Sequence, residues 1–192
     1  MFELEDKLKI ITINQDYMGA LYAVDSQVFY SPINYDSKPY LGILINDNGR
    51  KYAIPLTSAK PVHLNWDNYN NGRLLIYEIA NPSALSSNDI YKTLQDGTTK
   101  HILAALMINK MIPIKDGLYS VVDINHRSND NVVVTKYKQL LNKEFSFCVS
   151  KKEKIVNEAN KIYEKQIKTG KVYPKFCSFI KLEEVCDRYN NN

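Results

Sequence analysis

The sequence predicts an α+β fold in which an antiparallel sheet comes first and the last third of the chain is helical. Up to about residue 124, runs rich in β-branched and aromatic residues alternate with turn residues. From residue 131 onward, apolar residues recur instead at the spacing of amphipathic helices. Strands followed by a separate group of helices are typical of the α+β class.

Length and composition indicate one globular domain, residues 1–192. With 192 residues and 44% hydrophobic side chains, the chain can build one substantial core, but not two comfortable ones. No apolar run approaches the ~20 residues that span a bilayer, and the N-terminus is acidic. Three cysteines without metal-ligand spacing favour a reduced, cytoplasmic protein, although Cys177 and Cys186 could pair.

The N-terminal elements are a strand, a helix and a hairpin. Residues 7–13 (KLKIITI) are rich in β-formers. Asp16 can cap a helix whose apolar residues Tyr17, Leu21, Val24 and Val28 follow helical spacing. Residues 39–56 then form a hairpin around Asn46-Asp47-Asn48-Gly49. Pro55 cannot donate to a ladder, so we expect pairing to end there.

The middle of the chain continues the sheet. Residues 61–72 have loop composition, and residues 73–79 read as a strand that Asn81-Pro82 ends. Residues 83–99 remain ambiguous. Residues 101–108 have helical propensity, but their close boundaries favour a buried strand. Residues 118–124 form a further strand.

The last third contains three helices. Residues 131–149 and 151–169 each carry apolar residues at helical intervals, and Gly170 is a plausible C-cap for the second helix. Ser178 precedes a short final helix. The acidic group on that helix, Glu183, Glu184 and Asp187, is interpreted as a solvated face in preference to a set of metal ligands.

A group of cations and hydroxyls is expected where the hairpin ends. Thr57, Ser58 and Lys60 leave the second strand together, and Lys38 enters the first. Because an antiparallel hairpin brings these two segments side by side, we expect them to be neighbours, with no carboxylate among them. That chemistry suits a phosphodiester. The alternative is that Thr57 and Ser58 form a turn and Lys60 is solvated.

Metal-free cleavage of RNA is the reaction that such a group could perform. The 2′-hydroxyl of RNA can attack its own phosphorus, so the protein must move protons and stabilise negative charge. Lysines and hydroxyls can hold phosphate oxygens, with His63 as a further candidate. The sequence contains no Gly-rich phosphate loop, Cys-x-x-Cys pair or His-Glu-x-x-His motif, so we expect no metal and no cofactor.

Charge is distributed unevenly along the chain. Residues 1–96 carry 8 Lys and Arg against 11 Asp and Glu, and residues 97–192 carry 17 against 10, giving net charges of −3 and +7. This asymmetry suits polyanion binding by the C-terminal half, although solvated helix faces would give the same pattern. The candidate phosphate contacts there are Lys136, Lys138, Lys143, Lys151, Lys152 and Lys154.

The hairpin closely resembles that of the ToxN/AbiQ family, the endoribonuclease toxins of type III toxin–antitoxin and abortive-infection systems. The resemblance rests on residues 38–43 (KPYLGI) and 51–60 (KYAIPLTSAK) followed by His63, and continues in 111–114 (MIPI), 137–140 (YKQL) and 179–189. It implies a strongly twisted, partly barrel-like antiparallel sheet with surrounding helices, similar to MazF/Kid-type toxins. It also implies metal-independent cleavage of cellular or phage RNA, leaving 2′,3′-cyclic phosphate ends.

The family resemblance further implies a partner and a set of site residues. The partner is a small antitoxin RNA of tandem repeats, which the toxin cuts into pseudoknots that occupy its active site in a protein–RNA hetero-oligomer. The essential Thr, Ser and Lys of the family fall on Thr57, Ser58 and Lys60, and the Lys before the hairpin falls on Lys38. The active-site tyrosines would be Tyr17 and Tyr35, with Tyr30 as a competitor for Tyr35.

Three aromatic candidates follow the site. His63 could contact RNA or cap a loop. Trp66 and Tyr69 could each stack on a base or pack in the protein. The leading hypothesis is an RNA-cleaving toxin held inactive by its RNA antitoxin. A non-enzymatic RNA-binding protein is the alternative, and a protein-interaction module is a more distant one.

Overall fold

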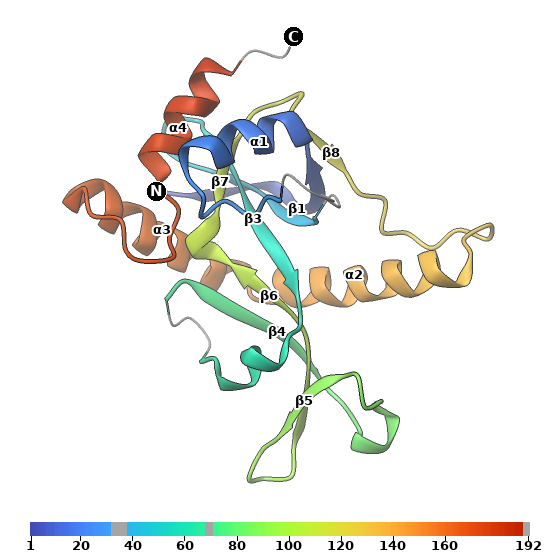
Figure 1. Ribbon diagram of the computed structural model, residues 1–192. Coiled ribbons are helices and arrows are strands. Elements are labelled where there is room, and N and C mark those ends of the chain that lie inside the picture. The colour runs from blue at the N-terminus through green and yellow to red at the C-terminus, as the bar shows by residue number, and fades with distance from the viewer. Residues whose placement is uncertain (32–37, 68–70, 190–192) are drawn as a thin grey trace.

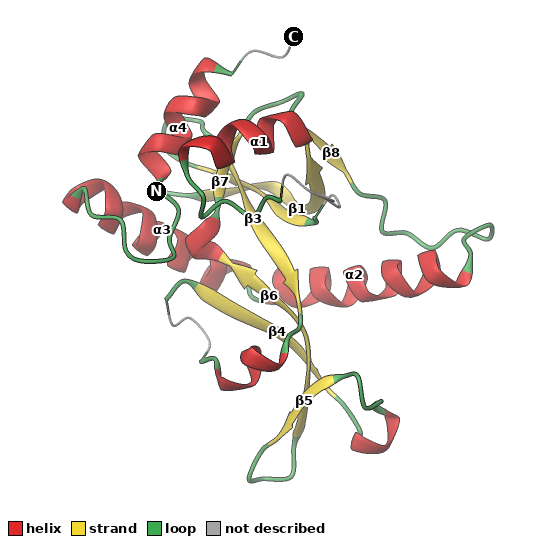
Figure 2. Cartoon of the chain, in the orientation of Figure 1, coloured by secondary structure: helices red, strands yellow, loops and turns green. Residues whose placement is uncertain are grey.

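The computed structural model describes residues 1–31, 38–67 and 71–189. In these residues the chain forms an antiparallel sheet of eight strands accompanied by four α-helices (Figures 1 and 2). The strands are β1 (Glu3–Ile13), β2 (Tyr40–Ile45), β3 (Lys51–Ser58), β4 (Arg73–Ile79), β5 (Ile90–Thr93), β6 (Thr99–Met107), β7 (Ile112–Ile114) and β8 (Tyr119–Val121). The helices are α1 (Gln15–Val24), α2 (Val132–Ser150), α3 (Lys152–Thr169) and α4 (Phe179–Arg188).

The α+β class and its antiparallel sheet are therefore confirmed. The strands are hydrogen-bonded in the order β4-β6-β3-β2-β1-β8, with β5 also paired to β6 and β7 to β3. Among the described residues, the two end strands of this order, β4 and β8, do not pair with each other, so the sheet is not closed. A partly barrel-like sheet similar to that of MazF and Kid therefore stays a prediction.

The first helix begins two residues earlier than expected. Asn14, not Asp16, is the N-cap, because its side-chain oxygen accepts a hydrogen bond from the backbone N–H of Tyr17 at 3.0 Å. The helix ends at Val24, so Val28 packs into the core from the segment that follows. Helical spacing alone could not show this end, because Asp25 interrupts the helix between two apolar residues of correct spacing.

The hairpin is confirmed, but Pro55 does not end its second strand. Strand β3 pairs with β2 from Lys51 to Pro55, and on its other edge it pairs with β7 at the start and with β6 at the end. The β7 ladder stops at Ala53 and the β6 ladder starts at Leu56. Because the Leu56 N–H points to Pro39 on the β2 side, at 3.0 Å, the missing N–H of Pro55 faces the gap between the two ladders. Pairing therefore continues to Ser58.

The long strand β6 joins the two halves of the sheet, as its buried apolar run predicts. It pairs with β4 along its whole length, with the end of β3, and with the short strand β5. The ambiguous residues 83–99 contain β5 and a turn at Gly97. Predicted strand 118–124 is shorter than expected, since only Tyr119–Val121 pairs with β1.

The helix-rich last third is confirmed with its predicted ends. Asn131 caps α2, Gly170 ends α3 with a φ of 64°, and α4 begins after Ser178. The acidic face of α4 is not simply solvated. Glu183 accepts hydrogen bonds from the hydroxyls of Tyr52 and Tyr163, and Asp187 pairs with Arg50 at 2.6 Å. These contacts attach α4 to the hairpin.

Two further observations bear on the expected class of protein. Cys148, Cys177 and Cys186 are all buried and free, so the alternative of a Cys177–Cys186 pair does not hold. Within the described part of the chain, no helix combines the length and the apolar character that crossing a membrane requires.

Candidate functional site

The end of β3 displays the three hydroxyl and lysine side chains that the sequence singled out. Thr57 is half-buried and pairs with Ala105 of β6, and Ser58 is exposed and pairs with Ala104. Lys60 follows, exposed, at the start of a short 3-10 helix, Pro61–Asn65. Because Ala104 has a small side chain, this end of the ladder leaves open space that a larger side chain would fill.

That space is a cavity of about 210 Å³ between β3, β6 and α2. It is lined by all four of the residues expected to cluster at the ends of the hairpin, namely Lys38, Thr57, Ser58 and Lys60. Apolar side chains complete much of the wall: Pro39, Leu56, Ala104, Leu140 and Leu141. Lys38 is exposed, with its Nζ atom 5.3 Å from the centroid of the Phe29 ring. The predicted juxtaposition of cations and hydroxyls is thus observed.

The expectation that no carboxylate lies among them is wrong. Helix α2 contributes Tyr137 and Glu144 to the same cavity, and Glu144 is only 4% exposed. Burial raises the pKa of the Glu144 carboxyl to about 7. The pKa of Tyr137 is also raised, chiefly by burial and then by Glu144. Sequence reasoning missed this pair because the hairpin's local geometry says nothing about which helix covers its end.

His63 lies next to the cavity without lining it. Its Nδ1 atom accepts a hydrogen bond from the backbone N–H of Lys60 at 3.1 Å, so of the two expected roles the structure shows the capping one. Burial lowers the pKa of His63, and the nearby charges of Lys60 and Arg73 lower it further. The imidazole is therefore held neutral at physiological pH, as an acceptor at Nδ1.

Trp66 is partly buried and packs against its neighbours in this loop. The centroid of its ring lies 4.3 Å from that of the His63 ring, and the Arg73 guanidinium also lies 4.3 Å from it. Both His63 and Trp66 line a second cavity of about 200 Å³, together with Tyr77, Lys92 and Lys100. Stacking of an RNA base on Trp66 stays a prediction.

Of the two tyrosine candidates, the structure describes Tyr17, which does not join the cluster. Tyr17 is fully buried, donates its hydroxyl to the Pro113 carbonyl at 2.7 Å and packs edge-on against Tyr189. Burial raises its pKa, and it does not line the Lys38–Lys60 cavity. Tyr35 and Tyr69 lie outside the described residues, and Tyr30 packs against Tyr22.

The six candidate lysines of the C-terminal half fall into two groups. Lys138 and Lys143 are ion-paired, with Asp130 at 2.9 Å and with Glu78 at 2.8 Å. The other four have no ion pair among the residues that the structure describes, and we call them the basic surface: Lys136, Lys151, Lys152 and Lys154. The last three gather where α2 meets α3, roughly 20 Å along α2 from Lys136 at ~1.5 Å per residue.

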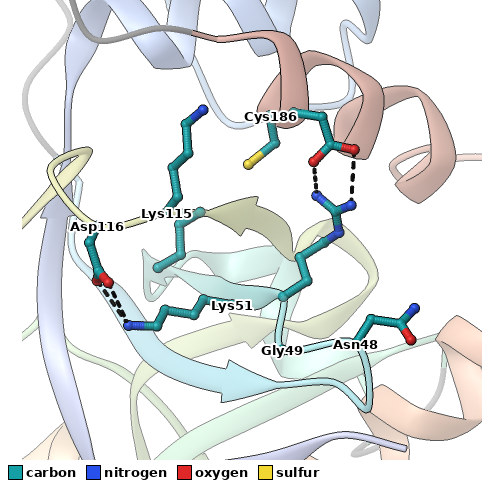
Figure 3. Close-up of a pocket in the computed structure, with 9 residues that line it drawn as sticks. Asn48, Gly49, Lys51, Lys115, Asp116 and Cys186 are labelled. Atoms are coloured by element: carbon teal, nitrogen blue, oxygen red, sulfur yellow. Dashed lines mark hydrogen bonds and ion pairs between the residues drawn. The ribbon is translucent and has the colours of Figure 1, made fainter.

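A larger pocket of about 440 Å³ lies at the other end of β3, between the hairpin turn and α4 (Figure 3). Two of its three cations are held in ion pairs, and the third, Lys115, donates to the backbone carbonyl of Tyr189. Arg50 forms a two-pronged bond with Asp187 at 2.6 and 3.0 Å, and Lys51 binds Asp116 at 2.9 and 3.0 Å. These ion pairs attach α4 and the loop before β8 to the hairpin. We therefore assign the pocket a structural role and take the Lys38–Lys60 cavity as the site.

Comparison with known proteins gives consistent matches along the chain. The family model described as "Toxin ToxN, type III toxin-antitoxin system" matches residues 9–187. Endoribonuclease ToxN of Bacillus thuringiensis subsp. kurstaki is 28% identical over 192 residues, covering 96% of this chain and 86% of the relative. Endoribonuclease ToxN of Pectobacterium atrosepticum is 28% identical over 179 residues, covering 92% and 91%.

A solved structure is similar to the whole fold. It comes from work on selective toxin inhibition by a non-coding RNA pseudoknot in bacterial type III toxin–antitoxin systems. It superimposes with a TM-score of 0.70 at 26% identity, covering 96% of this chain and 98% of that chain.

Proposed function

Since the chain belongs to the ToxN family of type III toxin–antitoxin toxins, we propose that it is an endoribonuclease toxin whose single domain spans residues 1–192. The observation that carries the proposal is the cavity in which Lys38, Thr57, Ser58 and Lys60 meet. Two relatives that share most of their length with this chain are endoribonucleases. The sheet is proposed to have the twisted, partly barrel-like form of MazF/Kid-type toxins.

The proposed reaction is cleavage of RNA by its own 2′-hydroxyl, without a metal ion. The substrate supplies the nucleophile, so the protein must hold the phosphate, stabilise added negative charge and move two protons. In this mechanism Lys38 and Lys60 bind the non-bridging phosphate oxygens, and the hydroxyls of Thr57 and Ser58 donate to them. The products are a 2′,3′-cyclic phosphate and a 5′-hydroxyl.

The proposed partner is a small repeat RNA antitoxin that the toxin processes and that then inhibits it as a pseudoknot. Its support is the family membership and the relation to a toxin studied with a pseudoknot inhibitor. The basic surface offers unpaired cations for the RNA backbone in addition to the cavity. The protein and its antitoxin would form a hetero-oligomer in the cytoplasm, with a role in abortive infection by phage.

One experiment tests this function. Purified protein is incubated in EDTA with a defined RNA and with the same RNA carrying one 2′-deoxy substitution at the cut position. We expect cutting to persist in EDTA, to leave a cyclic phosphate, and to stop at the deoxy position. A Ser58→Ala protein that binds RNA but does not cut it serves as the control for contaminating ribonucleases.

The outcomes separate the competing functions. Unchanged cleavage of the deoxy substrate would exclude attack by the 2′-hydroxyl, and loss of all cutting in EDTA would exclude the metal-independent reaction. Tight RNA binding by the wild-type protein with no cutting of any RNA, including its own repeat RNA, would instead favour the non-enzymatic RNA-binding alternative.

A further inference from the structure

Glu144 occupies an unusual position for a carboxylate. It lies on the buried face of α2 between Leu141 and Cys148, which are 1% and 0% exposed. Residues three and four apart share one face of a helix, so this row would ordinarily be apolar throughout. A glutamate within such a row must be withdrawn from water when the helix packs, which disfavours its charged form.

No neighbour compensates for this burial. Within the described residues, Glu144 forms no hydrogen bond or ion pair. The fully buried side-chain polar atoms that lack a partner there are Arg73 Nε and Asn109 Oδ1. The carboxylate oxygens of Glu144 are unpaired but are absent from this set, so they are not fully buried. We take their remaining exposure to be toward the cavity that the side chain lines. The carboxyl group can therefore reach a ligand that enters the cavity.

The groups around Glu144 differ in what they can do with a proton. Lys38, Lys60 and Tyr137 line the same cavity, and Cys148 lies one turn further along α2. Glu78 of β4, a carboxylate on a strand that packs against α2, forms an ion pair with Lys143. Burial raises the pKa of the Cys148 thiol to about 12, and burial also raises that of Tyr137. Both groups therefore keep their protons at neutral pH.

We propose that Glu144 is the general base that removes the 2′-hydroxyl proton of RNA, an inference that rests on the proposed function. In the part of the cavity wall that the structure describes, Glu144 is the one carboxylate, whereas the other polar side chains are ammonium or hydroxyl groups that donate. A base must accept a proton, so the choice among the lining residues follows from their chemistry.

The step balances as follows. The O–H bond of the 2′-hydroxyl breaks, its proton passes to a carboxylate oxygen of Glu144, and its electron pair forms the O2′–P bond. The P–O5′ bond breaks, and the departing 5′ oxygen takes a proton from a lysine ammonium of the same cavity. Proton transfer leaves Glu144 neutral, which is the form that its surroundings favour. Solvent restores both groups after the products leave.

The first test is the dependence of kcat/KM on pH for a short single-stranded RNA. The wild-type rate should rise tenfold per pH unit below about 7 and level off above it, because the ionised form is the active one. Glu144→Gln should reduce kcat/KM by ~10²–10⁴ and lose this rise. Glu144→Asp, which keeps a carboxylate on a shorter stem, should be slow but retain the rise. Glu184→Gln, on the exposed face of α4, is the matched control.

The second test distinguishes a base from an acid. RNA with sulfur in place of the 5′ bridging oxygen has a leaving group that needs no proton, so it compensates for a lost acid only. We expect Glu144→Gln to stay slow on this substrate. Its rescue to the wild-type rate would overturn the assignment, and so would a Glu144→Gln protein with an unchanged pH profile on ordinary RNA.

Failure of this inference and failure of the proposed function give different results. If the wild-type protein cuts RNA and Glu144→Gln behaves like it, the function stands and Glu144 is not the base. If the wild-type protein cuts no RNA under any condition, the proposed function fails, and the role of Glu144 fails with it. Circular dichroism of Glu144→Gln shows that the variant tested is folded.

Discussion

The buried carboxyl of Glu144 should make the stability of the protein depend on pH, in a way that can be measured without RNA. Its pKa rises from the ordinary value of 4.5 to about 7 in the folded protein, so between these values the folded state holds a proton that the unfolded state has released. Stability therefore falls as pH rises through this window and is constant above it. At ~1.4 kcal/mol per pH unit, the loss amounts to about 3 kcal/mol.

Replacing Glu144 by Gln removes this loss, since the amide does not titrate. The free energy of unfolding of Glu144→Gln minus that of wild type should thus be about 3 kcal/mol larger at pH 8 than at pH 4, which means that the variant gains stability relative to wild type as the pH rises. For a chain of this size, that difference corresponds to roughly 6–12 °C in Tm. Comparing the two pH values cancels any fixed cost of burying the amide.

Urea unfolding at pH 4, 6 and 8 measures this difference directly. Glu184→Gln, which changes an exposed carboxylate of α4, controls for the general effect of pH on the protein and should differ little from wild type. A constant difference between wild type and Glu144→Gln across this range would refute the reasoning, because it would mean that Glu144 titrates equally in the folded and unfolded chain.

Three further predictions concern the site and its supports. Lys60→Ala should lower the cleavage rate by ~10²–10³, because the ammonium group stabilises the negative charge added to the phosphate in the transition state. Circular dichroism should stay unchanged because Lys60 is exposed, and a fully active variant would place the site elsewhere. Charge reversal at the three lysines of the α2–α3 junction should weaken antitoxin binding and flatten its log–log salt slope by roughly 2–3, at ~0.7–0.9 per phosphate lost. Cleavage of a short RNA should change much less, and Lys168→Glu, whose lysine already pairs with a neighbouring glutamate, should leave the slope unaltered. Glu183→Ala should cost about 1–3 kcal/mol in urea unfolding by leaving the buried Tyr52 hydroxyl unpaired, and adding Tyr52→Phe should recover part of that loss if the hydroxyl is its cause.

The features that the sequence predicted well are those fixed by nearby residues. The turn at Asn46–Gly49 determines the hairpin, and the hairpin brings Lys38 to the end of β3. Gly170 ends α3 because its φ of 64° suits glycine. Pro55 shows the limit of such rules: the sequence shows that an N–H is missing, but not that the gap between β7 and β6 makes it unnecessary.

The features that sequence reasoning missed depend on how distant segments pack. Glu144 is one glutamate among the polar and apolar residues of α2, and only the docking of that helix over the end of β3 places it beside Ser58 and Lys60. Tyr17 shows the converse. Its position in an amphipathic helix agreed with either a core or a site role, and packing against Pro113 and Tyr189 buries it completely.

The side chains of the site therefore differ in their effect on the stability of the fold. Ser58 and Lys60 are exposed at the end of a strand, so the fold gains little from them and loses little without them. Glu144 works against the fold, since its ionised form is buried without a hydrogen-bond or ion-pair partner among the residues that the structure describes. Leucine at this position would extend the apolar row of Leu141 and Cys148 and would pack without a titratable group. A carboxylate that weakens the fold and lines the same cavity as two lysines and two hydroxyls is most simply explained by the removal of a proton, which those groups are not suited to perform.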